Sequence, residues 1–517
     1  MYKREPRVLS ATRVQETTFS LGMVAGLAAL ALLSAVLVQF PTLVLELILT
    51  LAVVAVLWRF RPVGLEIWKG MILTAVGSYM ILNYGFENLT LHVGPIPVIV
   101  GDSLMFGALA IVMFRYRGSV IKRVAQDPSF ICLLILLGLA VLHLLWDVPR
   151  FGLYAFRDAS IYIESLFFLI GSIWAMEKKN TRTLLKWFVL VFLVNMLYNA
   201  LFPFSMKLQS MSPQSGVFQT VPIIGHYDDS PLYLVAGALF FLWLGRRVSG
   251  MSRRLLWFCA AIQLCELGLL QTRSAYVGLG LILLLLLVFG EARKARQVIT
   301  VVLASLLALV VLIAGFSMAG VTISGRVGPV DMSFLKDHAE TIFMVNKQTE
   351  RWGSDDDRLD WYDQVWQRVT ASRLSLMWGQ GFGEPLIEFP SYRGRDSGVV
   401  VRQPHNSSLS VLGRLGLTGL AIWLSLHFFI LRTFYKGLRA RSLLDDVTAD
   451  LLLWLFFLYL LFMITTSVQP LLEFSHGAVP FFFLMGFAAG IVRWQVLEEV
   501  MTLRPGAIAF AKPIKVS

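Results

Sequence analysis

RQPHNSSLSVLGRLGLTGLAIWLSLHFFI, residues 402–430, joins a short polar segment to a long apolar run. A run of about 20 mainly apolar residues is long enough to cross the hydrocarbon core of a bilayer as a helix. Lipid offers no partner to unpaired backbone N–H and C=O groups, so such a run must be helical. The stretch therefore predicts a membrane helix whose polar entrance contains Arg402 and His405.

Similar runs recur along the 517 residues, of which 57% are hydrophobic and 15% charged. These features predict an all-α polytopic membrane protein with about fourteen transmembrane helices. The predicted runs are 20–39, 41–58, 69–86, 98–115, 129–147, 158–177, 184–204, 231–247, 254–270, 274–290, 297–319, 409–434, 449–469 and 477–496.

The net charge of +12 is concentrated in short segments between alternate runs, such as RYRGSVIKR at 115–123 and GRRVSGMSRR at 245–254. Lys and Arg are enriched in cytoplasmic loops of membrane proteins, so topology explains this charge better than nucleic-acid binding does. The pattern predicts a cytoplasmic N-terminal segment (1–19), helices 1–11 (20–320), a large exoplasmic loop (321–404), a re-entry helix with helices 12–14 (405–497), and a cytoplasmic tail (498–517).

The cysteines give no sign of redox or zinc chemistry. Cys132, Cys259 and Cys265 all fall in apolar runs, without a CxxC pair. We therefore expect neither a structural disulfide nor a cysteine metal site.

The large loop contains two recognisable segments. GSDDDRLDWYDQVWQRV, residues 353–369, predicts an amphipathic helix with Leu359, Tyr362, Trp366 and Val369 on one face. Its three aspartates are interpreted as helix capping rather than a calcium loop, which would need alternating ligands and a glycine. WGQGFGEP, residues 378–385, has three glycines that allow backbone to approach a neighbouring group closely.

Two arginines are predicted on the exoplasmic side, where the positive-inside rule does not explain them. Arg273 and Arg402 each precede a helix that begins at that face. Guanidinium groups pair with phosphate oxygens, and helix N-termini also favour anions. Two alternatives are a shared phosphate or pyrophosphate ligand and ordinary lipid headgroups.

His405, three residues after Arg402, is a candidate general base, because imidazole titrates near neutral pH. The alternative is a hydrogen-bonded structural histidine. The glycines at 413, 416 and 419 indicate close helix packing or a helix break, which would leave Arg414 at the interface. His226 and Asp228 are further candidates for lining the same cavity.

The chain resembles the O-antigen ligase and O-antigen polymerase superfamily of bacterial envelope glycosyltransferases. The resemblance covers about residues 270–430 and rests on four motifs in the family's order. These are QTRSAYVGLGLILLL (271–285), DRLDWYDQVWQRV (357–369), WGQGFGEP (378–385) and PHNSSLSVLGRLGLTGL (404–420).

This resemblance implies a GT-C-like membrane glycosyltransferase without a metal or other cofactor. The enzyme would move a glycan from undecaprenyl pyrophosphate to an acceptor hydroxyl, on a glycan or lipid A-core, at the outer side of the cytoplasmic membrane. By analogy, Arg273, Arg402 and Asn406 would bind the donor, and His405 would activate the acceptor. The remaining candidates for lining the cavity are His226, Asp228, Tyr276 and Arg414.

Three other functions compete with a ligase. Polymerisation of repeat units and transfer to a protein hydroxyl use the same residues and differ in the acceptor. A lipid-linked oligosaccharide flippase also needs a basic cavity, but we expect two similar halves in such a transporter, and the sequence shows no halfway repeat. Membrane lipid is an expected partner and nucleic acid is not.

Overall fold

The computed structural model describes residues 67–93, 96–116, 118–217, 220–225, 230–270, 272–288, 292–318, 323–325, 329–330, 353–388 and 402–496. The first two predicted runs, both predicted cytoplasmic ends and about half of the large loop lie outside these residues. His226 and Asp228 also lie outside them.

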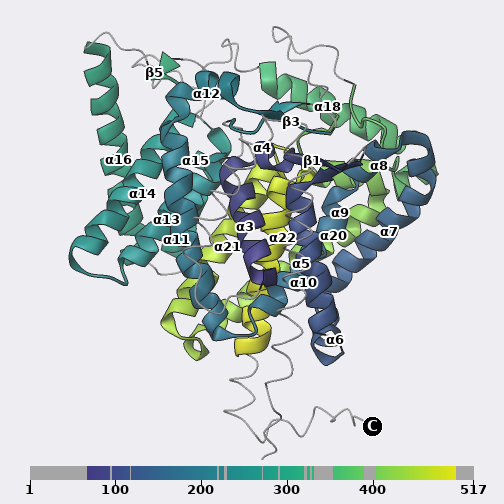
Figure 1. Cartoon of the computed structure of the whole chain (residues 1–517), viewed down its shortest axis with the longest axis horizontal. Helices are drawn as coiled ribbons and strands as arrows, with labels where there is room; N and C mark the ends of the chain where they lie inside the picture. Colours follow the sequence, from purple (N-terminus) through teal and green to yellow (C-terminus); the bar gives the residue numbers. More distant parts are fainter. Residues whose placement is uncertain are drawn as a thin grey trace, which may run out of the picture. The chain divides into compact units, whose positions relative to one another are not determined.

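Long helices make up most of the described chain (Figure 1). They are α3 (Ile67–Leu82), α5 (Val100–Arg115), α7 (Pro128–Phe151), α10 (Phe167–Trp174), α11 (Lys178–Ala200), α13 (Ser230–Gly245), α14 (Gly250–Leu270), α15 (Arg273–Val288), α16 (Ala292–Met318), α18 (Gly353–Thr370), α20 (Ser407–Arg439), α21 (Asp446–Thr466) and α22 (Ser475–Gly490).

Short elements connect the long helices. The helical ones are α4 (Tyr84–Glu87), α6 (Ser119–Ala125), α8 (Leu153–Asp158), α9 (Ser160–Glu164), η1 (Phe202–Phe204), α12 (Ser205–Met211), α19 (Arg373–Trp378), η3 (Arg441–Leu443), η4 (Leu471–Glu473) and η5 (Ile491–Val496). Three antiparallel pairs account for the described strands: β1 (Thr90–Val93) with β2 (Ile96–Ile99), β3 (Gln214–Ser215) with β4 (Val221–Pro222), and β5 (Ile323–Ser324) with β6 (Pro329–Val330).

Six described helices are long and apolar enough to cross a membrane, and the bent pair α5–α6 raises this number to seven. Four shorter apolar helices accompany them, at Ile67–Leu82, Ser160–Trp174, Pro231–Gly245 and Arg273–Val288. The predicted all-helical membrane architecture is thereby confirmed for the described residues. The total of about fourteen spans and the GT-C-like arrangement stay predictions.

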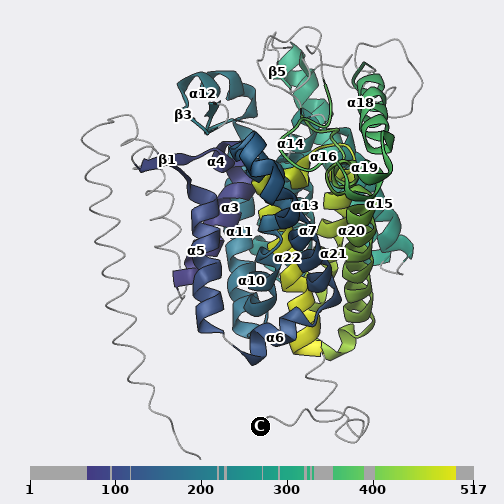
Figure 2. The ribbon, with the colours of Figure 1, turned by 90° about the vertical axis from the view of Figure 1, so that its right-hand side faces the viewer.

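Apart from α18, successive long helices run in alternate directions, so their connections gather at two ends (Figures 1 and 2). One end, called the loop end below, contains α8, α12, α18 and α19. At the opposite end Arg247 pairs with Asp446 and Asp450, and Arg493 pairs with Asp127. This basic end contains the Lys- and Arg-rich connections that the sequence assigns to one side of the membrane.

The core is centred on α22, whose spanning segment is completely buried. It lies against α10, and glycines on both helices allow this contact. A Cβ on Gly171 would lie 1.9 Å from Phe483 O, and one on Gly486 would lie 2.0 Å from Phe168 O. Small residues let helix backbones approach closely in membranes, so these two positions exclude any side chain.

The predicted break in α20 is present at Gly416, where φ is 65° and ψ is −163°. The first part of α20 therefore points in a different direction from the part that spans the membrane. Arg414, just before the break, is only 2% exposed. It is consequently buried in protein rather than placed at an open interface.

The predicted amphipathic helix of the large loop is confirmed as α18. Its buried face is different from the predicted one, because Leu359 is 65% exposed and Trp366 is 53% exposed. Val369 is buried as predicted, and Trp361 and Val365, which were not assigned to this face, are buried with it. They pack in a small cluster with Leu386 and Leu412. The face of α18 that is buried is therefore determined by the segment after α18 and by α20.

Candidate active site

The glycine-rich segment WGQGFGEP, here called the glycine turn (residues 378–385), lies along the first part of α20. Gln380 N donates to Gly413 O at 2.8 Å, and Gly381 N donates to Arg414 O at 3.1 Å. Gly379, Gly381 and Gly383 have φ values of 82°, 76° and 94°. Glycine adopts this left-handed region without a steric penalty, so the three glycines allow the turn to follow α20.

Two buried aspartates hold the glycine turn from the other side. Phe382 N donates to Asp147 Oδ2 at 2.7 Å, and Gly383 N donates to Asp158 Oδ2 at 3.1 Å. Asp147 belongs to α7 and Asp158 to α8. A Cβ on Gly381 would lie 2.4 Å from Asp147 Oδ2. Close approach of a carboxylate is thus the physical reason for the glycine at this position.

Asp158 also joins three arginines, two of which, Arg402 and Arg414, are distant in sequence. Arg414 Nη2 lies 2.7 Å from Asp158 Oδ2, and Arg402 Nη2 lies 3.4 Å from the same oxygen. Arg157 Nε lies 3.5 Å from Asp158 Oδ1. Three guanidinium groups therefore share one carboxylate. The immediate cluster has an excess of positive charge, which favours an anion.

Arg402 and Arg414 differ in how their remaining donors are used. Arg414 also donates to Gly381 O at 3.0 Å and to Glu384 O at 2.6 Å, and its side chain is 3% exposed. Arg402 donates to Gly383 O at 2.6 Å, and its buried Nε has no partner among the described residues. Arg414 therefore uses its N–H donors to hold the glycine turn, whereas Arg402 keeps one N–H donor, at Nε, that no described residue uses.

Tyr154 forms a partly exposed platform beside these cations. The guanidinium carbon of Arg402 lies 4.7 Å from the centre of its ring, and that of Arg157 lies 5.7 Å from it. Tyr154 is 41% exposed. Cation–π contacts of this kind hold guanidinium groups in place without using their N–H donors. An anion that approaches Tyr154 would thus meet two oriented cations.

His405 lies immediately before α20, in a backbone conformation unusual for a side-chain-bearing residue. Its φ is 53°, and its ring lies 5.0 Å from the ring of Trp361, in an edge-to-face arrangement. Positive φ in a non-glycine residue is uncommon and is often found where function imposes a geometry. The contact with α18 fixes the imidazole at the loop end.

Asn406 is the N-cap of α20. Its Oδ1 accepts a hydrogen bond from Leu409 N at 3.1 Å, and its Nδ2 donates to Ser467 O at 3.1 Å. Tyr362 OH donates to the same carbonyl at 3.4 Å. These bonds join α18, α20 and the end of α21, so Asn406 has a clear structural role in positioning its neighbour His405.

Glu473 is a buried acid next to the start of α20 that sequence reasoning did not identify. Ser407 Oγ donates to Glu473 Oε2 at 2.8 Å. Burial raises the pKa of Glu473 to about 7. The only available signal was an isolated acid in the otherwise apolar QPLLEFSHG, residues 469–477. Asp147 and Asp158 were also missed, because their partners in the glycine turn and α20 lie more than two hundred residues away, and Arg157 was missed with them.

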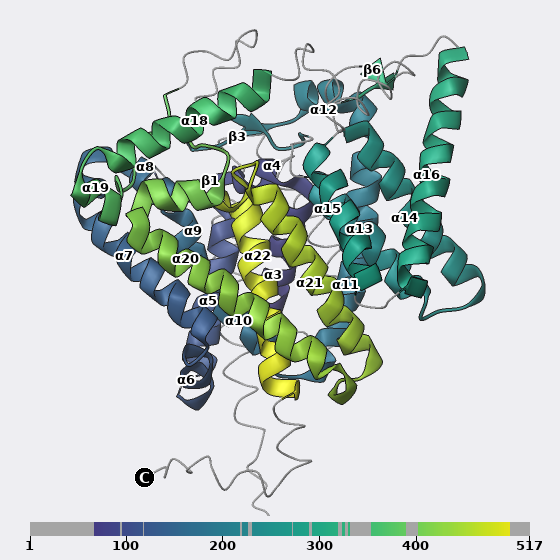
Figure 3. The same ribbon diagram turned by 180° about the vertical axis from the view of Figure 1, so that it is seen from behind.

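The other candidate residues lie on a different helix of the loop end. Arg273 begins α15, and Tyr276 OH donates to Leu267 O at 3.0 Å. Helices α15 and α20 each pack against α21, which lies between them in Figure 3. The structure therefore brings Arg402 and Arg414 together around Asp158. His405 and Asn406 lie between these two arginines in the chain. Arg273 and Tyr276 lie on a separate helix.

Within the part of the chain that the structure describes, no group of three or more His, Cys, Asp or Glu side chains is arranged to hold a metal ion. The chemical resources of the candidate site are instead guanidinium groups, an imidazole and a buried carboxyl. Such a set can bind a phosphate-containing group and accept a proton.

Residues 258–424 match the family model described as O-antigen ligase. No curated protein matches the chain. The matched region includes Arg273, the glycine turn, Arg402, His405 and Arg414, but ends before Glu473 and begins after Asp158. The resemblance to the O-antigen ligase superfamily, a family of membrane glycan-transfer proteins, is thereby confirmed for this region of the chain.

Proposed function

We propose that this protein is a membrane glycosyltransferase that moves a glycan from undecaprenyl pyrophosphate to an acceptor hydroxyl, in the manner of an O-antigen ligase. The family match over residues 258–424 supports the class of reaction. The observation with the greatest weight is the arginine cluster around Asp158. One member of this cluster, Arg402, lies three residues before His405 in the chain. The cluster offers an anion site beside a candidate proton acceptor.

In this proposal, Arg402 binds the pyrophosphate of the donor through the donors that Asp158 and Gly383 leave available. Arg273, at the start of α15, contributes a second guanidinium to the same donor. Both would stabilise negative charge that develops on the pyrophosphate as it leaves. Arg414 and Asp158 keep the glycine turn in place and so act as positioning residues.

His405 is the proposed general base. Its imidazole takes the proton from the acceptor hydroxyl while the acceptor oxygen attacks the anomeric carbon from the face opposite the pyrophosphate. The new glycosidic C–O bond forms as the old C–O bond to phosphate breaks. The electron pair leaves with undecaprenyl pyrophosphate, and the configuration at the anomeric carbon is inverted. This step needs neither a nucleotide sugar nor a metal.

The loop end is the proposed exoplasmic, or periplasmic, side of the cytoplasmic membrane. Basic connections cluster at the opposite end, and such segments are preferentially retained in the cytoplasm. Helix α18 and the glycine turn cover the site from this side, where they would limit access of water to the donor.

Transfer is tested by purifying the protein, reconstituting it with a polyprenyl-pyrophosphate-linked glycan and adding an acceptor lipid. We expect one glycan chain to be attached per acceptor and free polyprenyl pyrophosphate to be released. A glycan ladder formed without acceptor would instead establish a polymerase. Movement of donor across the bilayer without any new glycosidic bond would overturn the proposal in favour of a flippase.

The role of Arg402 is tested with Arg402→Lys and Arg402→Ala. Lysine keeps the charge but cannot form the bidentate contacts of a guanidinium. We expect both variants to raise the KM for donor, with a larger effect for alanine. Arg254→Gln, an exposed arginine at the basic end, is the matched control and should leave KM unchanged. An unchanged KM in both Arg402 variants would contradict donor binding by this residue.

A further inference from the structure

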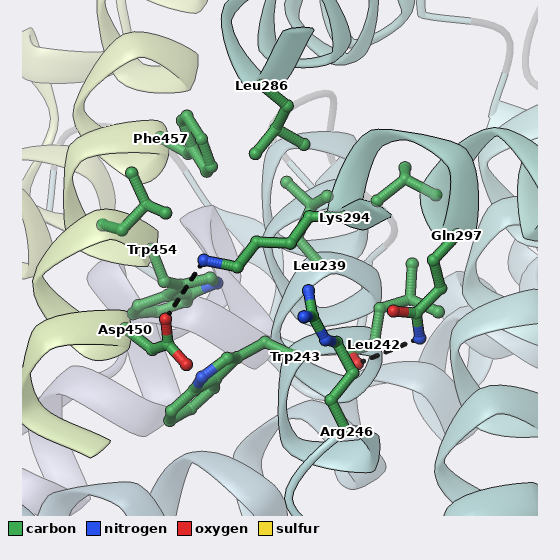
Figure 4. Close-up of a pocket in the computed structure, with 12 residues that line it drawn as sticks. Leu239, Leu242, Trp243, Arg246, Leu286, Lys294, Gln297, Asp450, Trp454 and Phe457 are labelled. Carbon is green, nitrogen blue, oxygen red and sulfur yellow. Dashed lines mark hydrogen bonds and ion pairs between the residues drawn. The ribbon is translucent and has the colours of Figure 1, made fainter. Parts of the chain in front are cut away.

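A cavity lies at the basic end, among α13, α15, α16 and α21 (Figure 4). Its floor is apolar and includes Leu239, Leu286 and Phe457. Its polar lining includes Arg246 and Lys294, whose charged groups point into the same space in Figure 4. The cavity is therefore amphipathic, with cations on one part of its wall and hydrocarbon on the other.

The charges around this cavity are not balanced. Lys294 Nζ lies 3.3 Å from Asp450 Oδ1, and Arg247 pairs with the other oxygen of Asp450 and with Asp446. Each of these two cations thus has a carboxylate. Arg246 makes no side-chain hydrogen bond or ion pair with any residue in the described ranges. Its guanidinium is the unmatched charge of the cavity.

The partial burial of Arg246 makes its unpaired charge an indication of a ligand site. Arg246 is half-buried beside Leu242 and Trp243, where a guanidinium loses part of its hydration. Nearby Gln297 donates to Leu242 O at 3.5 Å, and as a neutral amide it supplies no negative charge to balance Arg246. A cation in such a place is stabilised by an anion that enters the cavity.

The position of the cavity restricts the anion. It lies where membrane helices end, and α15 and α16 present exposed apolar side chains next to it, among them Leu284, Leu287, Val288 and Leu303. Exposed side chains of this kind on membrane helices face lipid. A ligand that matches both parts of the cavity has a negatively charged headgroup and an acyl chain.

We propose that this cavity binds an anionic phospholipid, with the headgroup phosphate on Arg246 and an acyl chain over the apolar floor. Guanidinium pairs with phosphate oxygens through two parallel N–H donors. Basic pockets between transmembrane helices recognise anionic headgroups at the cytoplasmic surface for the same reason. This site is separate from the candidate active site and does not depend on the proposed reaction.

Native mass spectrometry of the full-length protein provides the test. The protein, freed of co-purified lipid, is titrated with phosphatidylglycerol, with phosphatidylcholine of the same acyl chains, or with inorganic phosphate. We expect tighter binding of phosphatidylglycerol than of phosphatidylcholine. Arg246→Gln should weaken phosphatidylglycerol binding about fivefold, the usual effect of one basic residue near a membrane surface.

Two further variants separate lipid binding from folding and from net charge. Arg246→Lys keeps the charge and should retain most of the binding, whereas Arg254→Gln removes an exposed cation outside the cavity and should bind like the unmodified protein. Equal binding of the two phospholipids, or unchanged binding in Arg246→Gln, would overturn the proposal. Displacement of phosphatidylglycerol by millimolar inorganic phosphate would also overturn it, because the ligand would then be the free ion.

Discussion

Arg414 donates to Asp158 across 2.7 Å, although 256 residues separate the two in sequence. The arginine is 3% exposed and the aspartate side chain is fully buried. Because Asp158 also accepts from Gly383 N and Arg402, this single carboxylate connects α8, the glycine turn and the start of α20. The geometry around His405 depends on this connection.

Replacing Asp158 by Asn should strongly destabilise the protein. Arg414 would keep its charge in a buried site without a counter-ion, and removal of one partner of a buried pair typically costs about 3–5 kcal/mol. The free energy or midpoint of unfolding, measured in detergent, gives the result. Asp363→Asn, on the solvent side of α18, is the control. Equal stability of the two variants would show that Asp158 is not required for the fold.

Replacing Gly381 by Ala should destabilise the protein for two reasons, a left-handed backbone and a collision with Asp147. Gly118→Ala separates them. Gly118 has a similar φ of 79° but no atom within 4 Å of the added Cβ. Backbone strain alone costs about 1 kcal/mol, so the Gly118→Ala variant should lose about this much stability. The Gly381→Ala variant should lose clearly more. Equal losses in stability would mean that Asp147 does not require glycine here.

Glu473 should make stability depend on pH between about 4.5 and 7. Its pKa is about 7 in the folded protein and lower in the unfolded chain, so the folded state binds more protons in this interval. The free energy of unfolding should therefore fall by up to about 3 kcal/mol as pH rises from about 4.5 to 7. Above pH 7, Glu473 should contribute little further change.

Glu473→Gln tests this assignment, because the amide resembles the protonated acid and keeps an acceptor for Ser407. The variant should be more stable than the unmodified protein at pH 7.5 and should lose most of the slope between pH 5 and 7. Thermal unfolding across this pH range measures both quantities. An identical slope in the variant would assign the pH dependence to other groups.

Asn406 has a capping role that can be separated from its proposed role in donor binding. Asn406→Ala removes the acceptor for Leu409 N and should cost about 0.5–2 kcal/mol of stability. Asn406→Ser can still cap α20, so its stability should stay close to that of the unmodified protein. If Asn406 also binds donor, the serine variant should show a raised KM. Normal stability together with a normal KM would limit Asn406 to capping.

The sequence correctly predicted a helical membrane protein for the described residues, because a long apolar run has few alternatives in a membrane, but the total of about fourteen spans stays a prediction. The sequence also located α18, and it gave a helix break among Gly413, Gly416 and Gly419 as one of two alternatives, since both features depend on nearby residues. It assigned Leu359 and Trp366 to the buried face of α18, but the partners of α18 come from α20 and from the segment after it. Local periodicity contains no information about those distant partners.

The candidate site was predicted only in part, for the same physical reason. His405 and Arg402 stand out because they are polar residues at the entrance of an apolar helix. Asp147 and Asp158 gave no comparable signal, because an acid near a helix end usually contacts solvent. Their roles appear only when α7 and α8 are placed against the glycine turn. The binding and catalytic roles of Arg273, Arg402, His405 and the other candidates all stay predictions.

The most direct test of the central claim is the rate of glycan transfer by His405→Gln, measured with reconstituted protein at saturating donor and acceptor. Loss of a general base typically slows a reaction by about 10²–10⁴-fold. We predict a loss in this range, with the unfolding temperature and the KM for donor unchanged. Transfer at the rate of the unmodified protein would contradict the account, because the site would then have its proton acceptor elsewhere.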